Sequence, residues 1–169
     1  WSALGLGMDD WVSALAVLGT NLYAAGGFTT AGGVEAIQIA KWNGSEWSAV
    51  AKSSGLSDVV YALAVSGSNL YAGGLFTAAG GTAANYIAKW DGNTWSPLGS
   101  GMDNTVYALV MSGTDLYAAG LFTQAGGLTV NRVAKWDGTA WFALGSGVGS
   151  GNGILALTLS GNDLYAGGD

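Results

Sequence analysis

One aromatic and glycine-rich frame recurs along the chain, and this repeat constrains the possible fold more than any other feature. The frame reads LYAAGGFTTAGG from Leu22, LYAGGLFTAAGG from Leu70, LYAAGLFTQAGG from Leu116 and LYAGGD from Leu164. The spacings are 48, 46 and 48 residues. A period of this length is typical of repeat architectures, in which each repeat is one small unit packed on its neighbours.

The tryptophans keep the same register as the repeat. The sequences IAKWNG, IAKWDG and VAKWDG each contribute one tryptophan, and a second tryptophan follows each of them five residues later. Trp1 has the repeat position of the second tryptophan. The six internal positions are Trp42, Trp47, Trp90, Trp95, Trp136 and Trp141. Since seven of the eight tryptophans have a place in the repeat, their pattern indicates a packing role.

Each unit contains four strand signals and no sustained helical period. In the second unit they cover 60–67, 69–77, 86–92 and 94–100, with the hairpin signal Asp91-Gly92 before the last. The first strand is apolar on both sides, and the last holds the chain's one proline, Pro97, as expected of an outer edge. We therefore predict that burial decreases from the first strand to the fourth.

These units predict an all-β fold, a β-propeller with four-stranded antiparallel blades of about 46–48 residues and roughly 3.6 blades in this chain. We expect one repeat array over 1–169. Its predicted parts are a fourth strand of a shared blade at 1–4, full blades at 12–50, 60–98 and 106–144, and the first two strands of an incomplete blade at 154–169. A four-bladed ring that closes imperfectly, strands supplied by a neighbouring chain, and a window on a longer repeat all remain open.

The paired glycines of YAAGGFTTAGGV, residues 23–34, allow two interpretations. A phosphate-binding loop would need a helix to follow, and no helical pattern does. The glycines are better explained by a turn with positive φ angles. We expect Phe28, Phe76 and Phe122, at the same place in three repeats, to pack inward.

Composition excludes several functions. The net charge is -6, which disfavours nucleic acid and anionic membranes, and no apolar run is long enough for membrane insertion. There is no cysteine and no histidine, so thiolate chemistry and a Ser-His-Asp triad are absent. The two glutamates, Glu35 and Glu46, form no repeated carboxylate pair. We predict no catalytic residue and no cofactor.

The run LYAGG-x-FT-x-AGG, followed by IAKWDG-x-x-W-x-x-LG, resembles repeats of the cortical polarity-marker family of fungal cell-surface proteins. Similar repeats occur in large bacterial extracellular proteins, and kelch blades are loosely similar. The resemblance covers nearly the whole chain. It implies a β-propeller in an extracellular or cell-surface setting and implies no catalytic residue. The chain departs from it in having fewer than four full blades.

Sequence variation is concentrated on one predicted face, here called the loop face. It comprises the segments between second and third strands (34–38, 82–86, 128–132) and the loops between units (5–11, 51–58, 99–105, 145–153). Loops on a rigid scaffold commonly carry recognition. The predicted ligand or partner residues are Trp11, Glu35, Gln38, Tyr86 and Arg132. Trp11 is the one tryptophan outside the register, and we weigh sugar binding against packing on a neighbouring loop.

Two further sets of residues are candidates for function. Carboxylates in the loops between units could hold Ca²⁺ through oxygen ligands, or could be solvated turn residues. These carboxylates are Asp9, Asp10, Asp58 and Asp103. Open sheet edges at the two ends of the array could pair between chains. The predicted assembly edges are Trp1, Leu4, Leu164 and Tyr165.

The sequence thus favours a non-catalytic structural or interaction module of an extracellular or surface protein. Its expected partners are copies of itself, or protein or glycan at a surface, and assembly would give a ring or a filament. The alternative is a ligand-binding propeller that holds a carbohydrate or Ca²⁺ on the loop face.

Overall fold

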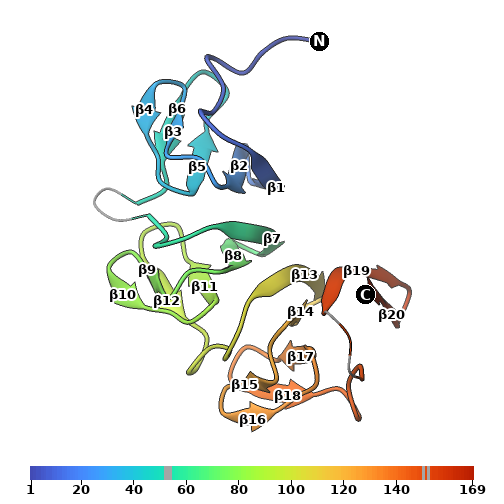
Figure 1. The fold of residues 1–169 in the computed structure, drawn as a ribbon. Coiled ribbons are helices and arrows are strands. Elements are labelled where there is room, and N and C mark those ends of the chain that lie inside the picture. Colours follow the sequence, from blue (N-terminus) through green and yellow to red (C-terminus); the bar gives the residue numbers. More distant parts are fainter. Residues whose placement is uncertain (52–54, 150, 152) are drawn as a thin grey trace.

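A computed structural model describes residues 1–51, 55–149, 151 and 153–169. All regular structure in this part of the chain is β-strand, arranged as successive sheets that follow one another in an open arc (Figure 1). The prediction of an all-β propeller with four-stranded antiparallel blades is confirmed.

Three blades are complete, and each has its strands in the order first, second, third, fourth. Blade I consists of β1 (Val12–Leu18), β2 (Asn21–Gly26), β5 (Ile39–Trp42) and β6 (Trp47–Ala49). Blade II consists of β7 (Val60–Ser66), β8 (Asn69–Gly74), β11 (Ile87–Trp90) and β12 (Trp95–Pro97). Blade III consists of β13 (Val106–Ser112), β14 (Asp115–Gly120), β17 (Val133–Trp136) and β18 (Trp141–Ala143). Blade IV is a two-stranded sheet of β19 (Ile154–Ser160) and β20 (Asp163–Gly168).

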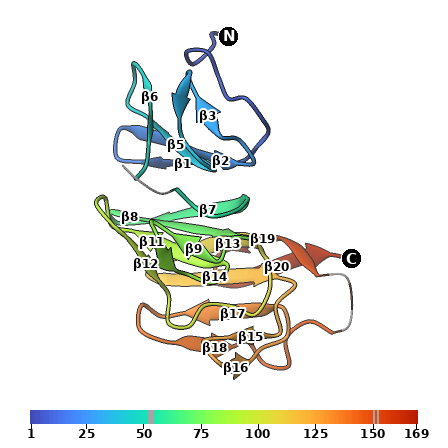
Figure 2. The same cartoon turned by 60° about the vertical axis from the view of Figure 1, so that its left-hand side comes forward.

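The first strands of neighbouring blades lie side by side, and the sheets stack on one another (Figure 2). The fourth strands form the outer edge, and Pro97 pairs there with Ala88. Because β12 has a neighbour on one side only within the described sheet, it is the kind of edge strand in which proline is tolerated.

A small hairpin follows the second strand of every complete blade, and the sequence analysis did not predict it. The hairpins are β3 (Thr30–Ala31) with β4 (Val34–Glu35), β9 (Ala78–Ala79) with β10 (Thr82–Ala83), and β15 (Gln124–Ala125) with β16 (Leu128–Thr129). In the first, the turn residues Gly32 and Gly33 have φ angles of 60° and 82°. Positive φ at both central residues is the requirement of a type I′ hairpin turn, so the glycine pair does serve a turn.

The prediction that burial decreases from the first strand to the fourth is wrong, because the second strand is the most buried one in each of the three complete blades. In β2, Ala24 and Ala25 have no exposed surface, whereas Val17 of the preceding strand is 66% exposed. A first strand is covered on one face by the preceding blade, and the described residues include no blade before β1. The second strand has a sheet neighbour on each side and further side chains above and below.

The aromatic frame forms the outer core of each blade. Phe28, Phe76 and Phe122 have no exposed surface, as predicted. The two tryptophans of each blade contact one another with ring centroids 5.3–5.4 Å apart. Residues 1–4, expected as a fourth strand, lie in no strand, since this chain offers no third strand beside them.

Candidate binding surfaces

Short hydrogen bonds attach the loop face to the blades. The carboxylate of Asp9 accepts hydrogen bonds from the backbone N–H groups of Thr29 (2.9 Å) and Thr30 (2.8 Å) and from the Thr29 hydroxyl (2.6 Å). Asp103 makes the same three contacts in blade III, with Thr123 and the N–H of Gln124. These two loops between units are therefore fixed on the hairpin segments of blades I and III.

These hydrogen bonds also set the charge state of the two carboxyl groups. The Thr29 hydroxyl, followed by the backbone donors, lowers the pKa of Asp9 to about 2. Burial alone would raise the pKa of Asp103, but the donors of Thr123 and Gln124 outweigh it and the pKa is lowered. Both groups are anionic acceptors at neutral pH.

The structure does not bring the predicted Ca²⁺ candidates together. Asp9 and Asp103 belong to different blades, and Asp10 and Asp58 each accept a hydrogen bond from the next residue's N–H at 2.7 Å. No group of three or more acidic side chains that could hold a metal ion occurs in the described residues. The geometry assigns these carboxylates to loop structure.

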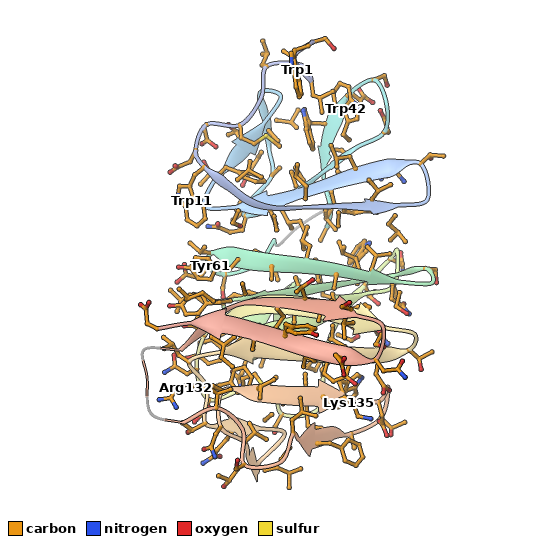
Figure 3. The ribbon with its side chains drawn as sticks, turned by 90° about the vertical axis from the view of Figure 1, so that its right-hand side faces the viewer. Trp1, Trp11, Trp42, Tyr61, Arg132 and Lys135 are labelled. Carbon is orange, nitrogen blue, oxygen red and sulfur yellow. The ribbon has the colours of Figure 1, made fainter. Side chains whose placement is uncertain are left out.

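Trp11 begins a row of aromatic side chains across three blades. Its ring stacks on Tyr61 with centroids 6.0 Å apart, and Tyr61 meets Tyr107 edge to face at 5.1 Å. Trp11 is 46% exposed, and Figure 3 shows Trp11 and Tyr61 together at one end of the inner strands. We call Trp11, Tyr61 and Tyr107 the aromatic row.

A β-bulge in the first strand of each blade positions the two tyrosines of the aromatic row. The pairing of each first strand skips its second residue, which in β7 and β13 is Tyr61 and Tyr107. A residue in such a β-bulge is released from the ladder, and bulges often redirect a side chain toward a site. Burial, with Tyr107 and Asp58 nearby, raises the pKa of the Tyr61 phenol, which therefore stays a neutral donor.

The sequence analysis identified Trp11 but missed the two tyrosines. The available signal was the repeated VYAL, in which Tyr61 and Tyr107 occupy the slot of Ser13 in β1. A second signal was Gly27, which stands where Leu75 and Leu121 stand in the other blades. A Cβ on Gly27 would lie 2.6 Å from the Trp11 indole nitrogen, so this glycine makes room for the ring.

Gln38, Tyr86 and Arg132 share one backbone conformation at the same position of three blades. Their φ angles are 64°, 64° and 66°, in the left-handed region that few residues other than glycine adopt. Each donates its N–H to the carbonyl of the buried phenylalanine of its blade and accepts from a glycine of the second strand. These hydrogen bonds hold the conformation, and the three side chains lie in three separate blades. Glu35 is exposed in β4.

Arg132 also connects two loops of the face. Its Nη1 donates to the carbonyl of Gly149 at 2.8 Å, and Figure 3 shows it beside the last inter-unit loop. The predicted partner residues are thus distributed around the arc, and only Trp11 belongs to a cluster of aromatic rings.

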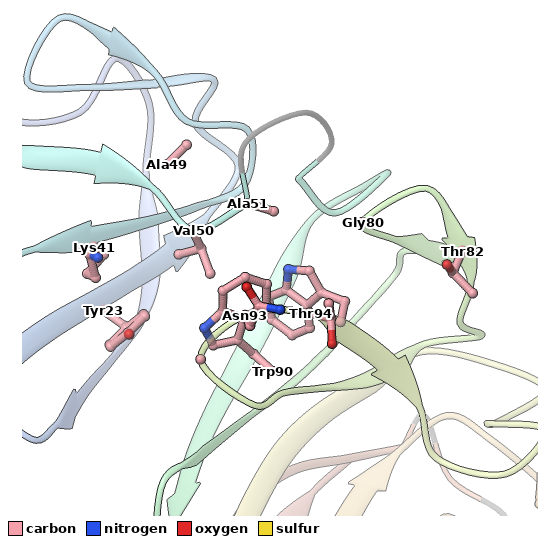
Figure 4. A pocket seen from close by; sticks show the side chains of 12 residues that line it. Tyr23, Lys41, Ala49, Val50, Ala51, Gly80, Thr82, Trp90, Asn93 and Thr94 are labelled. Atoms are coloured by element: carbon pink, nitrogen blue, oxygen red, sulfur yellow. The ribbon is translucent and has the colours of Figure 1, made fainter.

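A cavity of about 640 Å³ separates blades I and II near their outer strands (Figure 4). Tyr23 and Lys41 line it from blade I, and Trp90 and Trp95 from blade II. Val50 lies here where the other units have leucine, at Leu4, Leu98 and Leu144. We assign no ligand to this cavity, because Ala51 in its lining is the last residue described before position 55.

Both ends of the array expose apolar surface. Trp1 has no burial, and Leu4 is 40% exposed although its carbonyl accepts a hydrogen bond from the Trp47 indole at 2.8 Å. At the other end Leu164 is partly buried against blade III, whereas Tyr165 is 54% exposed. The four predicted edge residues therefore lie at two opposite ends of the arc.

Comparison with known proteins supports the fold and adds no function. No protein-family model matches the chain, and no curated protein matches it either. The crystal structure of the computationally designed Ika8 protein is similar, with a TM-score of 0.53 and 14% sequence identity. The match covers 96% of this chain and 57% of the designed chain. The protein is thus an all-β repeat protein of the propeller type that spans a little over half the length of this structural neighbour.

The described residues include no helix that is long and apolar enough to span a bilayer.

Proposed function

We propose that the protein is a non-catalytic structural and interaction module that assembles with copies of itself through the open ends of its blade array. One observation carries the proposal. The faces that are buried between blades inside the chain are exposed at blade I and blade IV, where Val17 is 66% and Tyr165 54% exposed. Contiguous exposed apolar surface on a soluble fold is typical of an interaction site.

The setting of this module is an extracellular or cell surface. The resemblance of its repeats to those of the cortical polarity-marker family, and more loosely to kelch blades, supports this part of the proposal. Other copies of the chain are the first expected partners, and a protein or glycan at the same surface is the second. Assembly yields a ring when the rotation between copies closes and a filament when it does not.

The particle mass in solution tests the assembly. Light scattering with negative-stain microscopy should give a mass that is a multiple of the 16.9 kDa chain, with closed rings or filaments in the images. A compact particle with the mass of one chain at every concentration would contradict the proposal.

The aromatic row favours a second candidate function, the binding of a carbohydrate on the loop face. Three adjacent aromatic rings with tyrosine hydroxyl groups offer flat apolar faces together with hydrogen-bond donors. Adding soluble oligosaccharides should change the fluorescence of the wild-type chain, and this change should be lost in Tyr61→Ala, which removes one ring of the row and keeps Trp11 as the reporter. A matched control is Leu128→Ala, because Leu128 is similarly exposed (49%) and lies outside the row. Equal responses in both variants would refute this candidate.

A further inference from the structure

Neighbouring blades are joined by one recurring apolar interface. Between blades I and II, Val60, Leu63 and Val65 of β7 share a cluster with Tyr23 and Ala25 of β2. The side chains of a first strand thus cover the second strand of the blade before it. The corresponding contacts involve Val106, Leu109 and Met111 with Tyr71 and Gly73 at the next interface, and Ile154 and Leu157 with Ala119 at the last.

Each end of the chain presents one half of this interface. The head is the face of β1 at the positions that pack in the other blades, and Val12, Leu15 and Val17 are 41%, 62% and 66% exposed there. By contrast, Val60 has no exposed surface. The head therefore presents the first-strand side chains that, inside the chain, pack on the second strand of the preceding blade.

The tail is the face of β19 and β20 on which, inside the chain, the first strand of a following blade would pack. Tyr165 of β20 is 54% exposed, whereas Tyr23 and Tyr71 at the same position are 5% and 7% exposed. Its neighbours Ala156 and Gly167 are exposed as well. Neither the head nor the tail positions carry a charged side chain, so the two faces can meet without burying an unpaired charge.

We propose that the head of one copy docks on the tail of a second copy and reproduces the interface between blades. This inference rests on the proposed assembly and names its two surfaces. The Leu4 carbonyl before β1 supports it, because it makes the contact that the outer end of one blade makes with the next blade. Leu4 accepts the Trp47 indole N–H at 2.8 Å, just as Leu98 of blade II accepts that of Trp141 in blade III at 2.9 Å.

The docked unit would combine parts of two chains. Strands β19 and β20 of one copy supply its inner half, and the segment before β1 of the next copy lies at its outer side. Because head and tail are different surfaces, copies joined in this way close into a ring, of which two copies are the smallest, or extend into a filament.

Two single substitutions test the register of this contact. Leu15→Glu blocks the head and Tyr165→Glu blocks the tail, and both replace exposed side chains, so the chain should still fold. Each should weaken assembly at least about tenfold, because a carboxylate would be buried without a partner. Leu128→Glu, at a similarly exposed position on β16, is the matched control and should assemble as the wild type does.

Mixing the variants gives the decisive result. A chain with Leu15→Glu keeps its tail and one with Tyr165→Glu keeps its head, so an equal mixture should form two-chain particles and nothing larger. Light scattering measures the mass, and circular dichroism verifies that each variant is folded. A mixture that stays monomeric, or variants that assemble like the control, would overturn the head-to-tail contact while leaving assembly itself standing. A wild-type chain that never exceeds one chain's mass would overturn both.

Discussion

Replacing Gly73 by alanine should destabilise the protein, although alanine occupies the same repeat position in two other blades, at Ala25 and Ala119. A Cβ on Gly73 would lie 2.5 Å from Cγ1 of Val106 and 3.1 Å from its Cβ. Val106 has no exposed surface and is β-branched, so its side chain has few other rotamers available. Blade III would have to shift away from blade II.

The magnitude follows from two opposing effects. Overpacking of a dense core costs about 1–3 kcal/mol. Exchanging glycine for alanine returns about 0.4–1 kcal/mol, because the unfolded chain loses conformational freedom. The net loss in the free energy of unfolding should be about 1–2 kcal/mol.

The matched control is Gly167→Ala, at the same repeat position in blade IV. No atom lies within 4 Å of the added Cβ there, so stability should stay equal or rise slightly. Urea unfolding of both variants, at concentrations where the mass is that of one chain, gives the midpoint and slope. If Gly73→Ala unfolds at or above the wild-type midpoint with an unchanged slope, the close packing of blades II and III is refuted.

Three other substitutions probe the core, the loop conformation and the pH dependence. Phe76→Ala should lower the free energy of unfolding by about 3–5 kcal/mol, since the ring is fully buried; a loss below 1 kcal/mol in urea unfolding would show that the site is not a packed core. Gln38→Gly should raise the free energy of unfolding by about 1 kcal/mol, because Gln38 has a φ angle of 64° and its Oε1 is buried without a hydrogen-bond partner. A melting temperature below that of the wild type would contradict this. Asp9, whose pKa falls from 3.8 to about 2 on folding, stabilises the fold above pH 4, and this contribution is lost as the pH drops toward 2. Between pH 5 and pH 2 the unfolding midpoint of Asp9→Asn should therefore fall less than that of the wild type. An equal fall in both proteins would refute the role of the Thr29 hydrogen bonds.

The repeat alone predicted the blades, because strand formation depends on local alternation and on turn residues that lie close in sequence. The period placed Phe28, Phe76 and Phe122 in the core, and the single proline marked the outer edge. The paired glycines indicated a turn with positive φ. The hairpins around these turns were missed, since strands of two residues are too short to show a period.

The candidate sites were less accessible to sequence reasoning. Trp11 stood out because it breaks the register, but its contact with Tyr61 joins residues of different blades and depends on a β-bulge that no local pattern reveals. The carboxylates of Asp9 and Asp103 suggested an ion, while folding directs them to backbone donors twenty residues away.

The sequence by itself determined the class of fold, the period of the blades within this chain and the type of side chain at each repeated position. These follow from hydrogen bonding and hydrophobic period within a single unit. The tertiary structure alone decided which of the equivalent positions are buried. Val60 and Val12 have the same place in the repeat, yet one is fully covered and the other 41% exposed, because burial depends on the presence of a neighbouring blade.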